Sequence, residues 1–597
     1  MTWEAWLTIG LIGLMALAIL RRLAGPDTVL LGGLAVVMGL RVISDAFPET
    51  HLAVAGFGSK AVVTIGVLFV VAEGLRQTGA MAMLTRPLLG RPKSVAGAQI
   101  RLMLPVAGLS AFLNNTPIVA MMTPVVSDWC RRTGFSPSKL FIPLSYAAIM
   151  GGSCTLIGTA TNVFVYGEYA AALERDPSLS SVELKMFSVA WVAVPAALIG
   201  IGYLVLVSRW LLPDRTPAIS QADAKRYTFE MVVDEQSQVD GRTIEDAGLR
   251  QLPGAYLIGL DRDGDRRVAI GPQTRLQCGD ILIFAGVIDS MMDLSQTKGL
   301  SHSMRDSSAA INDLKLIEVV VSDRNPLAGK SIRQGGFRSI YNAVVIAVHR
   351  GGEHLAIKIG DIVLRPGDTL LLEADAQFVE RFRNRPDFYF VHALGAAQPV
   401  RSNKAVMALI LLGLIVVAAT TGVMELVTAA LLGGGVMILT GCCTAHEARQ
   451  SINWRVLMMM GAAIGFGTAL QSTGAAQGLA SQIIDLCDPY GPRAILLAIY
   501  LVAMVFTSII GPVPTAGLMF PVVTAIASTR GYSLTPFAIG LMMTAAASFA
   551  TPSAYQTNLM VYSVGGYRPS DFVRIGLPLN LLVMIVTVIL APWFWPF

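Results

Sequence analysis

Charge is scarce in this sequence. Only 14% of its 597 residues are Asp, Glu, Lys or Arg, whereas 54% are hydrophobic. A soluble domain usually devotes about a quarter of its residues to charge, so most of this chain is poorly suited to face water. The charges concentrate in residues 213–402, while residues 1–212 and 403–597 consist mainly of long apolar runs. Since a bilayer core of about 30 Å requires roughly 20 apolar residues per helix, we expect an α-helical polytopic membrane protein with a soluble insert.

Motifs of catalysis and metal binding are also missing. The six cysteines form no CxxC pair, which disfavours a metal site or a disulfide framework. We find no HExxH, GxSxG or P-loop in a suitable context, so neither an enzyme nor a bound cofactor is expected. The net charge of +5 is small enough for basic loops on one membrane face to explain it, and no nucleic-acid partner is expected.

Apolar runs of spanning length occur in both halves. In the first half they are expected at about 5–20, 27–46, 59–75, 140–151, 160–172 and 186–211, and in the second at about 404–421, 424–441, 455–471, 534–548, 557–567 and 573–596. Two further stretches, 98–127 and 494–527, are too long for one straight span and carry polar residues and prolines near their middles. We therefore predict that each of them forms a re-entrant helical hairpin.

Basic residues indicate the orientation, because cytoplasmic loops of membrane proteins carry an excess of Lys and Arg. If the N-terminus lies outside, most Lys and Arg near the span ends fall on the inner side. This assignment predicts a multi-pass protein of the inner (plasma) membrane, with both termini outside and residues 213–402 in the cytoplasm. The first hairpin then enters from the cytoplasm and the second from outside.

The two apolar halves resemble each other. Three pairs of segments match at offsets of 395 to 397 residues: Leu75–Ala80 with Leu470–Ala475, Met122–Val126 with Met519–Val523, and Thr161–Asn162 with Thr557–Asn558. The predicted orientation gives the two copies opposite directions across the bilayer. Inverted repeats of this kind are a common plan of secondary transporters, whose substrate sites lie at the repeat interface near the midplane.

The insert is duplicated as well, at a constant offset of 88 residues. The aligned segments are Phe229–Val233 with Ile317–Val321, Gly241–Ile244 with Gly329–Ile332, and Gly279–Leu282 with Gly367–Leu370. In each copy, β-branched alternation and turn dipeptides predict a strand, a short helix and three further strands joined by turns. The expected domains are therefore two transmembrane repeats, 1–212 and 403–597, and two α+β domains, 213–305 and 306–402.

A polar break interrupts the first predicted hairpin at Asn114–Pro117. The proline cannot donate a backbone hydrogen bond, and such a break is tolerated in a membrane only if it is buried or lines a cavity. Free carbonyl and hydroxyl oxygens at a break suit Na⁺, whereas amide donors and a helix N-terminus suit anions. A proline kink packed against a neighbouring helix is the alternative interpretation.

Further breaks occur at matching places in the two halves. Gly158–Asn162 and Ala550–Asn558 place small hydroxyl residues and Asn between apolar flanks, and Gly511–Thr515 interrupts the second predicted hairpin. Such residues also serve as contacts between packed helices, but their recurrence in both halves favours a binding role. Glu73 is expected to pair with Arg76, and no histidine falls in a predicted span, so the site consists of neutral polar groups and helix ends. This composition suits an anion accompanied by cations, or an uncharged polar solute.

These motifs resemble those of the divalent anion–sodium symporter family within the ion-transporter superfamily. Asn114–Thr116 resembles a tip motif of the Ser-Asn-Thr type, Gly158–Thr159 the glycine–hydroxyl pair facing it, and Ala550–Asn558 the corresponding segment of bacterial permeases. The resemblance implies a homodimeric elevator-type transporter of a small anion with Na⁺ as the coupling ion. It implies Na⁺ ligands at Asn114, Asn115, Gly158, Thr161, Asn162, Ala550, Gln556 and Asn558, and substrate contacts at Asn114, Asn115, Thr116, Thr159, Thr515, Thr551, Pro552 and Ser553.

One position departs from the family pattern. Counting back from Pro521 as from Pro124, Gly511–Val513 occupies the place of the second tip motif, and Pro512 stands where the family has Asn. Thr515 supplies a hydroxyl slightly displaced along the chain. The second Na⁺ site and a dicarboxylate substrate therefore do not follow from the resemblance.

The insert resembles a tandem pair of TrkA-C domains, the C-terminal lobes of regulators of potassium conductance (RCK). Neither copy carries GxGxxG, so the nucleotide-binding lobe of those regulators is not expected. The resemblance implies either a small regulatory ligand at 213–402 or a purely dimerising role. Permeases with such an insert include sulfate transporter-like proteins, so a sulfate-like inorganic anion or a dicarboxylate is the expected substrate. A ligand-gated ion channel and a transporter of a neutral polar solute stay open, although no TVGYG-type selectivity filter is present.

Overall fold

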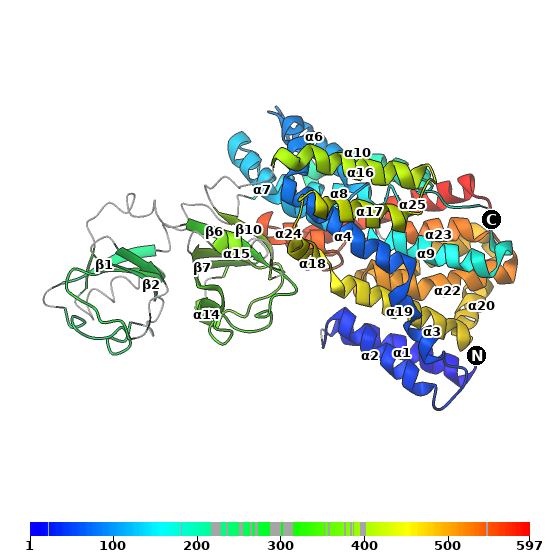
Figure 1. Ribbon diagram of the computed structural model, residues 1–597, viewed down its shortest axis with the longest axis horizontal. Helices are drawn as coiled ribbons and strands as arrows, with labels where there is room; N and C mark the ends of the chain where they lie inside the picture. Colours follow the sequence, from blue (N-terminus) through cyan, green and yellow to red (C-terminus); the bar gives the residue numbers. More distant parts are fainter. Residues whose placement is uncertain are drawn as a thin grey trace. The chain divides into compact units, whose positions relative to one another are not determined.

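The chain folds into two compact units, seen in the computed structural model of Figure 1. The first unit is built from Met1–Asp214, Pro399–Val561 and Pro569–Phe597, and the second from Arg215–Gln398 and Tyr562–Arg568. The structure describes residues 1–21, 23–180, 182–215, 228–234, 237–249, 255–262, 265–268, 271, 273–286, 300–302, 315–350, 353–355, 359–374, 378–382, 385, 387–393, 402–544 and 547–597.

The first unit is helical, and its two halves repeat one order of helices. The first half contains α1 (Trp3–Leu20), α2 (Pro26–Leu40), α3 (Thr50–Val54), α4 (Lys60–Thr78), α5 (Ala80–Leu89), α6 (Val95–Ser110), α7 (Asn115–Thr133), α8 (Phe141–Gly152), α9 (Ala160–Arg175) and α10 (Ala190–Leu211). The second half contains α16 (Ala405–Thr420), α17 (Leu426–Leu439), α18 (Ala445–Ser451), α19 (Trp454–Ser472), α20 (Ala475–Cys487), α21 (Pro492–Ile510), α22 (Pro512–Arg530), α23 (Leu534–Thr544), α24 (Gln556–Val564) and α25 (Pro569–Phe594). Short 3₁₀ turns lie at Ala55–Gly58, Pro137–Lys139, Pro177–Leu179, Ser402–Lys404 and Asp488–Tyr490.

Six helical stretches in the described part of the chain are long and apolar enough to cross a bilayer. They are Trp3–Leu20, Thr50–Thr78, Ala190–Leu211, Pro492–Ile510, Pro512–Arg530 and Pro569–Phe594. A seventh is obtained if α19 and the following helical segment, which meet at 75°, count as one broken span. Other predicted spans are shorter helices: α8 has 12 residues and α24 has 9. The chain is a multi-pass membrane protein in which several predicted straight spans are interrupted.

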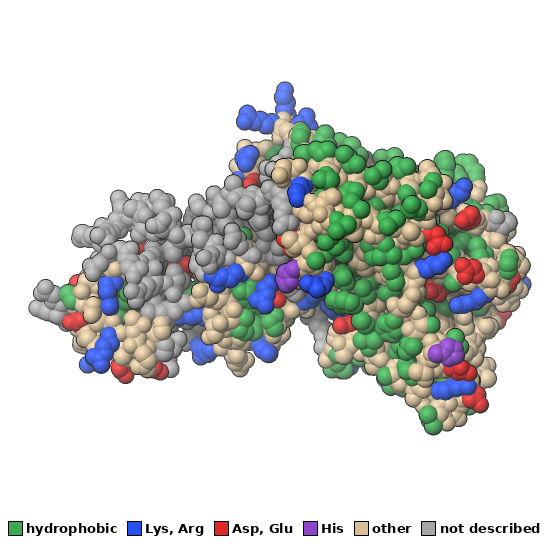
Figure 2. Space-filling model, in the orientation of Figure 1, with side chains coloured by type: hydrophobic (Ala, Val, Ile, Leu, Met, Phe, Trp, Pro, Cys, Tyr) green, Lys and Arg blue, Asp and Glu red, His purple; other side chains and the backbone are tan. Residues whose placement is uncertain are grey.

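The outside of the helical unit is largely apolar. Leu14 of α1, Leu206 of α10, Leu414 of α16 and Ile585 of α25 are each more than half exposed. Figure 2 shows hydrophobic side chains over much of the visible face of this unit. Contiguous apolar surface of this extent would promote aggregation in water, whereas it is well solvated by lipid acyl chains. The outward-facing composition therefore agrees with a membrane setting.

Local chemistry explains the turns of the two helix pairs that were predicted as hairpins. α6 ends at Ser110, and α7 begins at Asn115 after residues 111–114. α21 and α22 are separated by Gly511 alone, which has φ 90° and ψ 167°. This backbone conformation requires glycine, and Pro512 suits the first helical position because an N–H there would have no intrahelical partner. The second turn is tighter than the first and offers fewer polar groups.

The second unit contains two five-stranded antiparallel sheets. The first has the order β3-β2-β4-β1-β5, with β1 (Thr228–Val233), β2 (Ala255–Arg262), β3 (Asp265–Val268), β4 (Ile281–Gly286) and β5 (Leu300–His302). The second has the order β10-β6-β9-β7-β8, with β6 (Lys315–Val321), β7 (Ala343–Arg350), β8 (Glu353–His354), β9 (Thr369–Ala374) and β10 (Phe388–Ala393). Read in reverse, the second order matches the first strand for strand. The second copy also has α14 (Phe337–Tyr341), α15 (Phe378–Phe382) and a 3₁₀ turn at Ile359–Asp361. In the first copy, residues 237–249 contain turns, and the short helix expected at the place equivalent to α14 falls on 249–253, almost entirely outside the described residues.

The duplication of the insert extends to individual hydrogen bonds. Arg262 donates to both carboxylate oxygens of Asp280, at 2.7 and 2.8 Å, and to a backbone carbonyl. Arg350, 88 residues later, donates to both oxygens of Asp368 at 2.7 Å, and to the corresponding carbonyl. Hydrogen bonding to Asp368 raises the pKa of the Arg350 guanidinium above its usual value. Both copies thus use one arginine to close the same turn.

Candidate functional site

The tip between α6 and α7, here called the first tip, contacts the second half of the chain directly. Asn115 is 1% exposed; it accepts a hydrogen bond from Ser110 Oγ at 2.7 Å and donates one to the Tyr555 hydroxyl at 2.9 Å. Thr116 Oγ1 donates to Gln556 Oε1 at 3.3 Å. Tyr555 lies at the end of the break between α23 and α24, and Gln556 is the first residue of α24. The structure therefore brings the predicted site residues Asn115, Thr116 and Gln556 together.

Oxygen atoms crowd around two glycines at the α8–α9 break. A Cβ placed on Gly158 would come closer than 3.0 Å to the carbonyl oxygens of Gly152, Ser110 and Ala111. A Cβ on Gly152 would collide with Asn115 Oδ1. Only glycine permits these approaches, so the loop lies directly against the first tip. Unwound carbonyls gathered in this way are the usual Na⁺ ligands of broken transporter helices.

One asparagine in each half supports the loop of its own broken helix. Asn162 Nδ2 donates to two carbonyl groups of residues 153–155, at 3.3 and 2.8 Å. Asn558, 396 residues later, does the same for residues 548–551, at 2.8 and 3.2 Å. Both side chains are fully buried, and their amides satisfy carbonyls that the helix break would otherwise leave unpaired. In each of these two predicted Na⁺ ligands the amide nitrogen is thus occupied by the loop, and the side-chain oxygen is not.

Four buried side-chain oxygens of the first unit have no hydrogen-bond partner among the described residues. They are Thr161 Oγ1, Asn162 Oδ1, Thr507 Oγ1 and Thr551 Oγ1. Buried polar atoms are nearly always hydrogen-bonded, so each of these oxygens needs an explanation. An amide oxygen accepts and cannot donate, so Asn162 Oδ1 suits a cation or an external donor. A hydroxyl can donate to an anion, and the unpartnered oxygens of the second half are both hydroxyls.

The tip between α21 and α22, the second tip, lacks the asparagine of the first. At the offset of 397 residues, Ser110 corresponds to Thr507 and Asn115 corresponds to Pro512. Pro512 has no side-chain oxygen to accept from the neighbouring hydroxyl, which explains why Thr507 Oγ1 has no partner. Thr515 Oγ1, predicted to contact the substrate, donates to a backbone carbonyl of its own turn at 2.8 Å. The second tip therefore keeps the break and presents one free hydroxyl.

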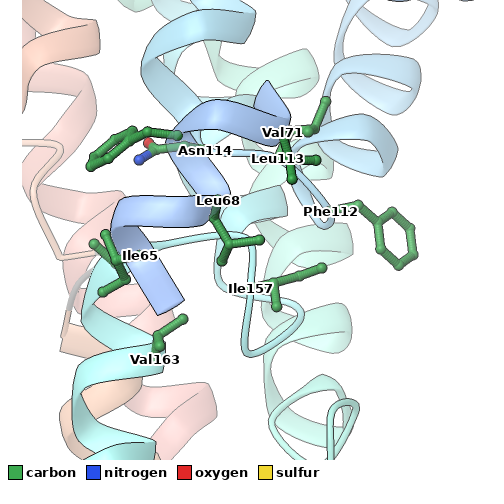
Figure 3. Close-up of a pocket in the computed structure, with 10 residues that line it drawn as sticks. Ile65, Leu68, Val71, Phe112, Leu113, Asn114, Ile157 and Val163 are labelled. Carbon is green, nitrogen blue, oxygen red and sulfur yellow. The ribbon is translucent and has the colours of Figure 1, made fainter. Parts of the chain in front are cut away.

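Asn114 lies in different surroundings from its neighbour Asn115. It lines a small pocket, drawn in Figure 3, whose other lining residues are all apolar: Ile65, Leu68, Phe69, Val71, Phe112, Leu113, Ile157, Ala160 and Val163. This pocket lies between α4, the first tip and the start of α9. No second polar side chain joins Asn114 there, so its role as a ligand rests on the family resemblance alone.

The remaining predicted substrate contacts are distributed along the two breaks. The Thr159 hydroxyl lies 3.4 Å from the Tyr555 hydroxyl and so joins the cluster around Asn115. Ala550 and Pro552 are half-buried, and Ser553 is exposed.

Two residues of the first-tip cluster were not predicted. The Tyr555 hydroxyl accepts a hydrogen bond from the Asn115 amide, and the Ser110 hydroxyl donates one to the Asn115 side-chain oxygen. The available signal for Tyr555 was its place 396 residues after Thr159, inside the polar segment of the second half. Ser110 has a weaker signal, since a serine five residues before a tip motif is common in any helix.

A buried carboxylate of α4 is already paired. Glu73 accepts from Arg76 at 2.7 and 2.6 Å and from Gln77 at 2.7 Å, which confirms the expected ion pair. Within the described ranges, no group of three or more His, Cys, Asp and Glu side chains could hold a metal ion. The candidate site is therefore a set of neutral oxygens, amides and helix ends.

Known proteins resemble the chain over nearly its whole length. Residues 15–546 match the citrate transporter family, CitMHS. A protein of Chlamydomonas reinhardtii named for sulfur deprivation response regulation is 35% identical over 93% of this chain and 95% of that protein. Sodium/sulfate cotransporter 2 of the same organism is 26% identical, over 98% of this chain and 89% of the relative. The uncharacterized transporter YfbS of Escherichia coli (strain K12) is 30% identical, over 91% and 92% respectively.

Proposed function

The chain belongs to the citrate transporter family, CitMHS, and we propose that it is a secondary active transporter that couples the movement of a small anion to Na⁺. Sulfate is the favoured substrate, and a dicarboxylate is the alternative. A sodium/sulfate cotransporter that aligns with 98% of the chain supports this choice. The neutral chemistry of the site supports it as well, because the site has no fixed charge of its own to bind either ion singly.

The observation that carries the proposal is the division of unpartnered oxygens between the halves. The first half offers Asn162 Oδ1, an obligate acceptor, beside the Thr161 hydroxyl and the carbonyl-rich loop at Gly158. The second half offers the hydroxyls of Thr507 and Thr551. Acceptors attract a cation, and hydroxyl donors attract an anion. We assign the Na⁺ site to the first half and the anion-facing donors to the second.

Neutrality of the site explains why the two ions would travel together. Moving an isolated anion into a low-dielectric interior is costly unless it is paired or fully hydrogen-bonded. Neutral hydroxyl donors offset part of that cost, and a cation bound nearby offsets more. Binding of each ion then strengthens binding of the other by the same factor. This reciprocity is the physical basis of the proposed coupling.

The repeated helix order supports a transport cycle in which the two halves work as inverted repeats. In this proposal the pairs α6–α7 and α21–α22 are re-entrant hairpins, and they move with the broken helices α8–α9 and α23–α24 as one transport domain. The remaining spans form a scaffold that dimerises. The two sheets of the insert, similar to tandem TrkA-C domains, bind a regulatory ligand in the cytoplasm or strengthen the dimer.

Uptake into proteoliposomes tests the function. Purified protein is reconstituted, and uptake of radiolabelled sulfate and of radiolabelled succinate is followed under an inward Na⁺ gradient and under an equal K⁺ gradient. We expect sulfate to accumulate above its outside concentration with Na⁺ only, and a sodium ionophore to abolish the accumulation. Equal uptake with both gradients, or uptake of neither anion, would contradict the proposal. Single-channel currents across a planar bilayer would favour the ligand-gated channel instead.

A further inference from the structure

Two buried side-chain oxygens of the second half are hydrogen-bonded by a single serine, whereas the equivalent two oxygens of the first half have no partner among the described residues. Ser145 Oγ of α8 donates to Asn558 Oδ1 at 2.7 Å and lies 2.9 Å from Thr557 Oγ1. All three residues are fully buried. The corresponding atoms 396 residues earlier, Thr161 Oγ1 and Asn162 Oδ1, have no partner among the described residues. Two equivalent sites therefore differ in one respect, the presence of a hydroxyl facing them.

The sequence shows why only one pair receives a hydroxyl. The position 396 residues after Ser145 is Leu541 of α23, which has no donor. The difference leaves a pair of cation-binding side-chain oxygens unpartnered in the first half alone.

We propose that Ser145 takes the place of a second coupling cation, so that this transporter binds one Na⁺ per cycle, at the Thr161–Asn162 pair, and none at Thr557–Asn558. This inference rests on the proposed function. The hydroxyl hydrogen of Ser145 supplies the positive partner that Asn558 Oδ1 would otherwise take from an ion. A cation could bind there only by displacing the Ser145 hydroxyl hydrogen from Asn558 Oδ1.

Thr551 Oγ1, unpartnered among the described residues, belongs to the same break as the Ser145-capped pair, and it fits the same assignment. Its equivalent in the first half, Thr155, donates to the carbonyl of Ala111 at the first tip. A lone hydroxyl beside capped acceptors is a poor cation site, since hard cations require several oxygens together. It is a good donor to an anion. The second break is therefore specialised toward the anion and away from Na⁺.

The number of coupling ions is measured in proteoliposomes loaded with defined gradients. If one Na⁺ accompanies each divalent sulfate, one negative charge enters per cycle, so an inside-negative potential slows uptake and the dependence on Na⁺ has a Hill coefficient of about 1. Ser145→Ala removes the donor and opens the second pair to Na⁺. We expect its Hill coefficient to rise toward about 2, and its uptake to lose the sensitivity to voltage because the cycle becomes electroneutral.

Ser208→Ala is the matched control. Ser208 Oγ of α10 is also buried and donates to an amide oxygen on another helix, Gln99 Oε1, at 2.9 Å. The same chemical deletion at this position should change neither the Hill coefficient nor the voltage response. If Ser145→Ala does not fold, Ser145→Cys, with its weaker donor, takes its place.

The outcomes separate this inference from the proposed function. A wild-type Hill coefficient near 2 with voltage-independent uptake overturns the inference and leaves Na⁺-coupled transport intact. The inference also fails if the folded Ser145 variant behaves like the wild type. Sulfate uptake that ignores Na⁺ altogether would instead remove the proposed function on which the inference rests.

Discussion

The insert and the membrane unit each contain two copies of one arrangement, but the hydrogen bonds compared here are the same in both copies of the insert and differ between the membrane halves. In the insert, Arg262–Asp280 and Arg350–Asp368 repeat the same set of hydrogen bonds at one offset. In the membrane unit, the loop-supporting amides of Asn162 and Asn558 are repeated, whereas the groups around them differ. Hydrogen bonds that maintain the fold are thus the same in both copies, and the differences gather where ions would bind.

This contrast indicates what the membrane halves do. Two copies with one task can keep identical interactions, as the two sheets of the insert do. Halves that handle ions of opposite charge need opposite donors and acceptors at equivalent positions. The two tips differ in this way. At the first tip the Ser110 hydroxyl has Asn115 as its acceptor, whereas at the second tip Pro512 stands at the equivalent position and the Thr507 hydroxyl has no partner. Substitutions at these equivalent positions, and in the two copies of the insert, test the difference.

The largest effect is expected for Asn115→Ala. The substitution leaves the buried Ser110 hydroxyl without its acceptor, at a cost of about 1–3 kcal/mol, and removes the Asn115 amide from the Tyr555 hydroxyl, which keeps Thr159 at 3.4 Å. We expect Na⁺-driven sulfate uptake to fall by more than about 100-fold, since 1.4 kcal/mol corresponds to a factor of ten, while the protein still elutes as a folded species in gel filtration. Asn453→Ala, which removes only the N-cap of α19, is the control and should retain uptake. Near-normal uptake by the Asn115 variant would remove the first tip from the mechanism.

A smaller but still large effect is expected for Gly158→Ala. The added Cβ would overlap carbonyl oxygens at the first break, and overpacking of this kind typically costs about 1–3 kcal/mol. The half-saturating Na⁺ concentration should rise by about tenfold or more. Gly202→Ala in α10 has no atom within 4 Å of the new Cβ and should leave it unchanged. The reverse change in the second half, Ala554→Gly, should have little effect, and equal effects of the two would contradict the difference between the halves.

A moderate effect is expected for Thr507→Val at the second tip. Valine keeps the shape and removes an unpartnered hydroxyl, so the melting temperature should rise slightly, since leaving that group buried is unfavourable. If the hydroxyl donates to the anion, the KM for sulfate should increase by about three- to tenfold, the value of one hydrogen bond. Thr524→Val in α22, the helix on the other side of the second tip, removes a hydroxyl that already donates to Phe520 O, and its KM should stay unchanged. A stabilised variant with an unaltered KM would show that the hydroxyl faces no substrate.

The smallest effect on transport is expected in the insert. Arg262→Gln and Arg350→Gln each leave a buried carboxylate without its bidentate partner, which should destabilise the respective sheet by about 1.5–3 kcal/mol. Hydrogen exchange of β4 and β9 in the full-length protein measures this effect, and we expect the two variants to match. The half-saturating concentrations of Na⁺ and sulfate should remain as in the wild type. A change of Na⁺ affinity in one variant alone would show that the insert copies are less equivalent than their hydrogen bonds suggest.

Much of the architecture could be predicted from patterns in the sequence. The length of the apolar runs indicated a helical membrane protein. The two constant offsets indicated the matches between its halves and the duplicated insert, because repetition is a property of the chain itself. The helices α5, α18 and α20 were not predicted. They are short, so their apolar content never reaches the length of a span.

The site could be predicted only in part. The breaks at Asn114–Thr116 and Gly158–Asn162 were visible because polar residues and prolines stand out in apolar surroundings. The partners across the halves were not visible, since Tyr555 meets Asn115 and Ser145 meets Asn558 only after folding. The separation of Asn114 from Asn115 depends on the direction of two adjacent side chains at a turn, which no spacing rule specifies.

If the first half binds the cation and the second half faces the anion, a matched pair of substitutions should separate the two functions. Thr161→Val and Thr551→Val each remove one buried, unpartnered hydroxyl from equivalent breaks of the two halves. Initial rates of sulfate uptake are measured in proteoliposomes over full ranges of Na⁺ and of sulfate. We predict that Thr161→Val raises the half-saturating Na⁺ concentration and leaves the sulfate KM at saturating Na⁺ unchanged, whereas Thr551→Val raises the sulfate KM and leaves the Na⁺ dependence unchanged. The reverse pattern, or two variants that shift both constants alike, would contradict the account.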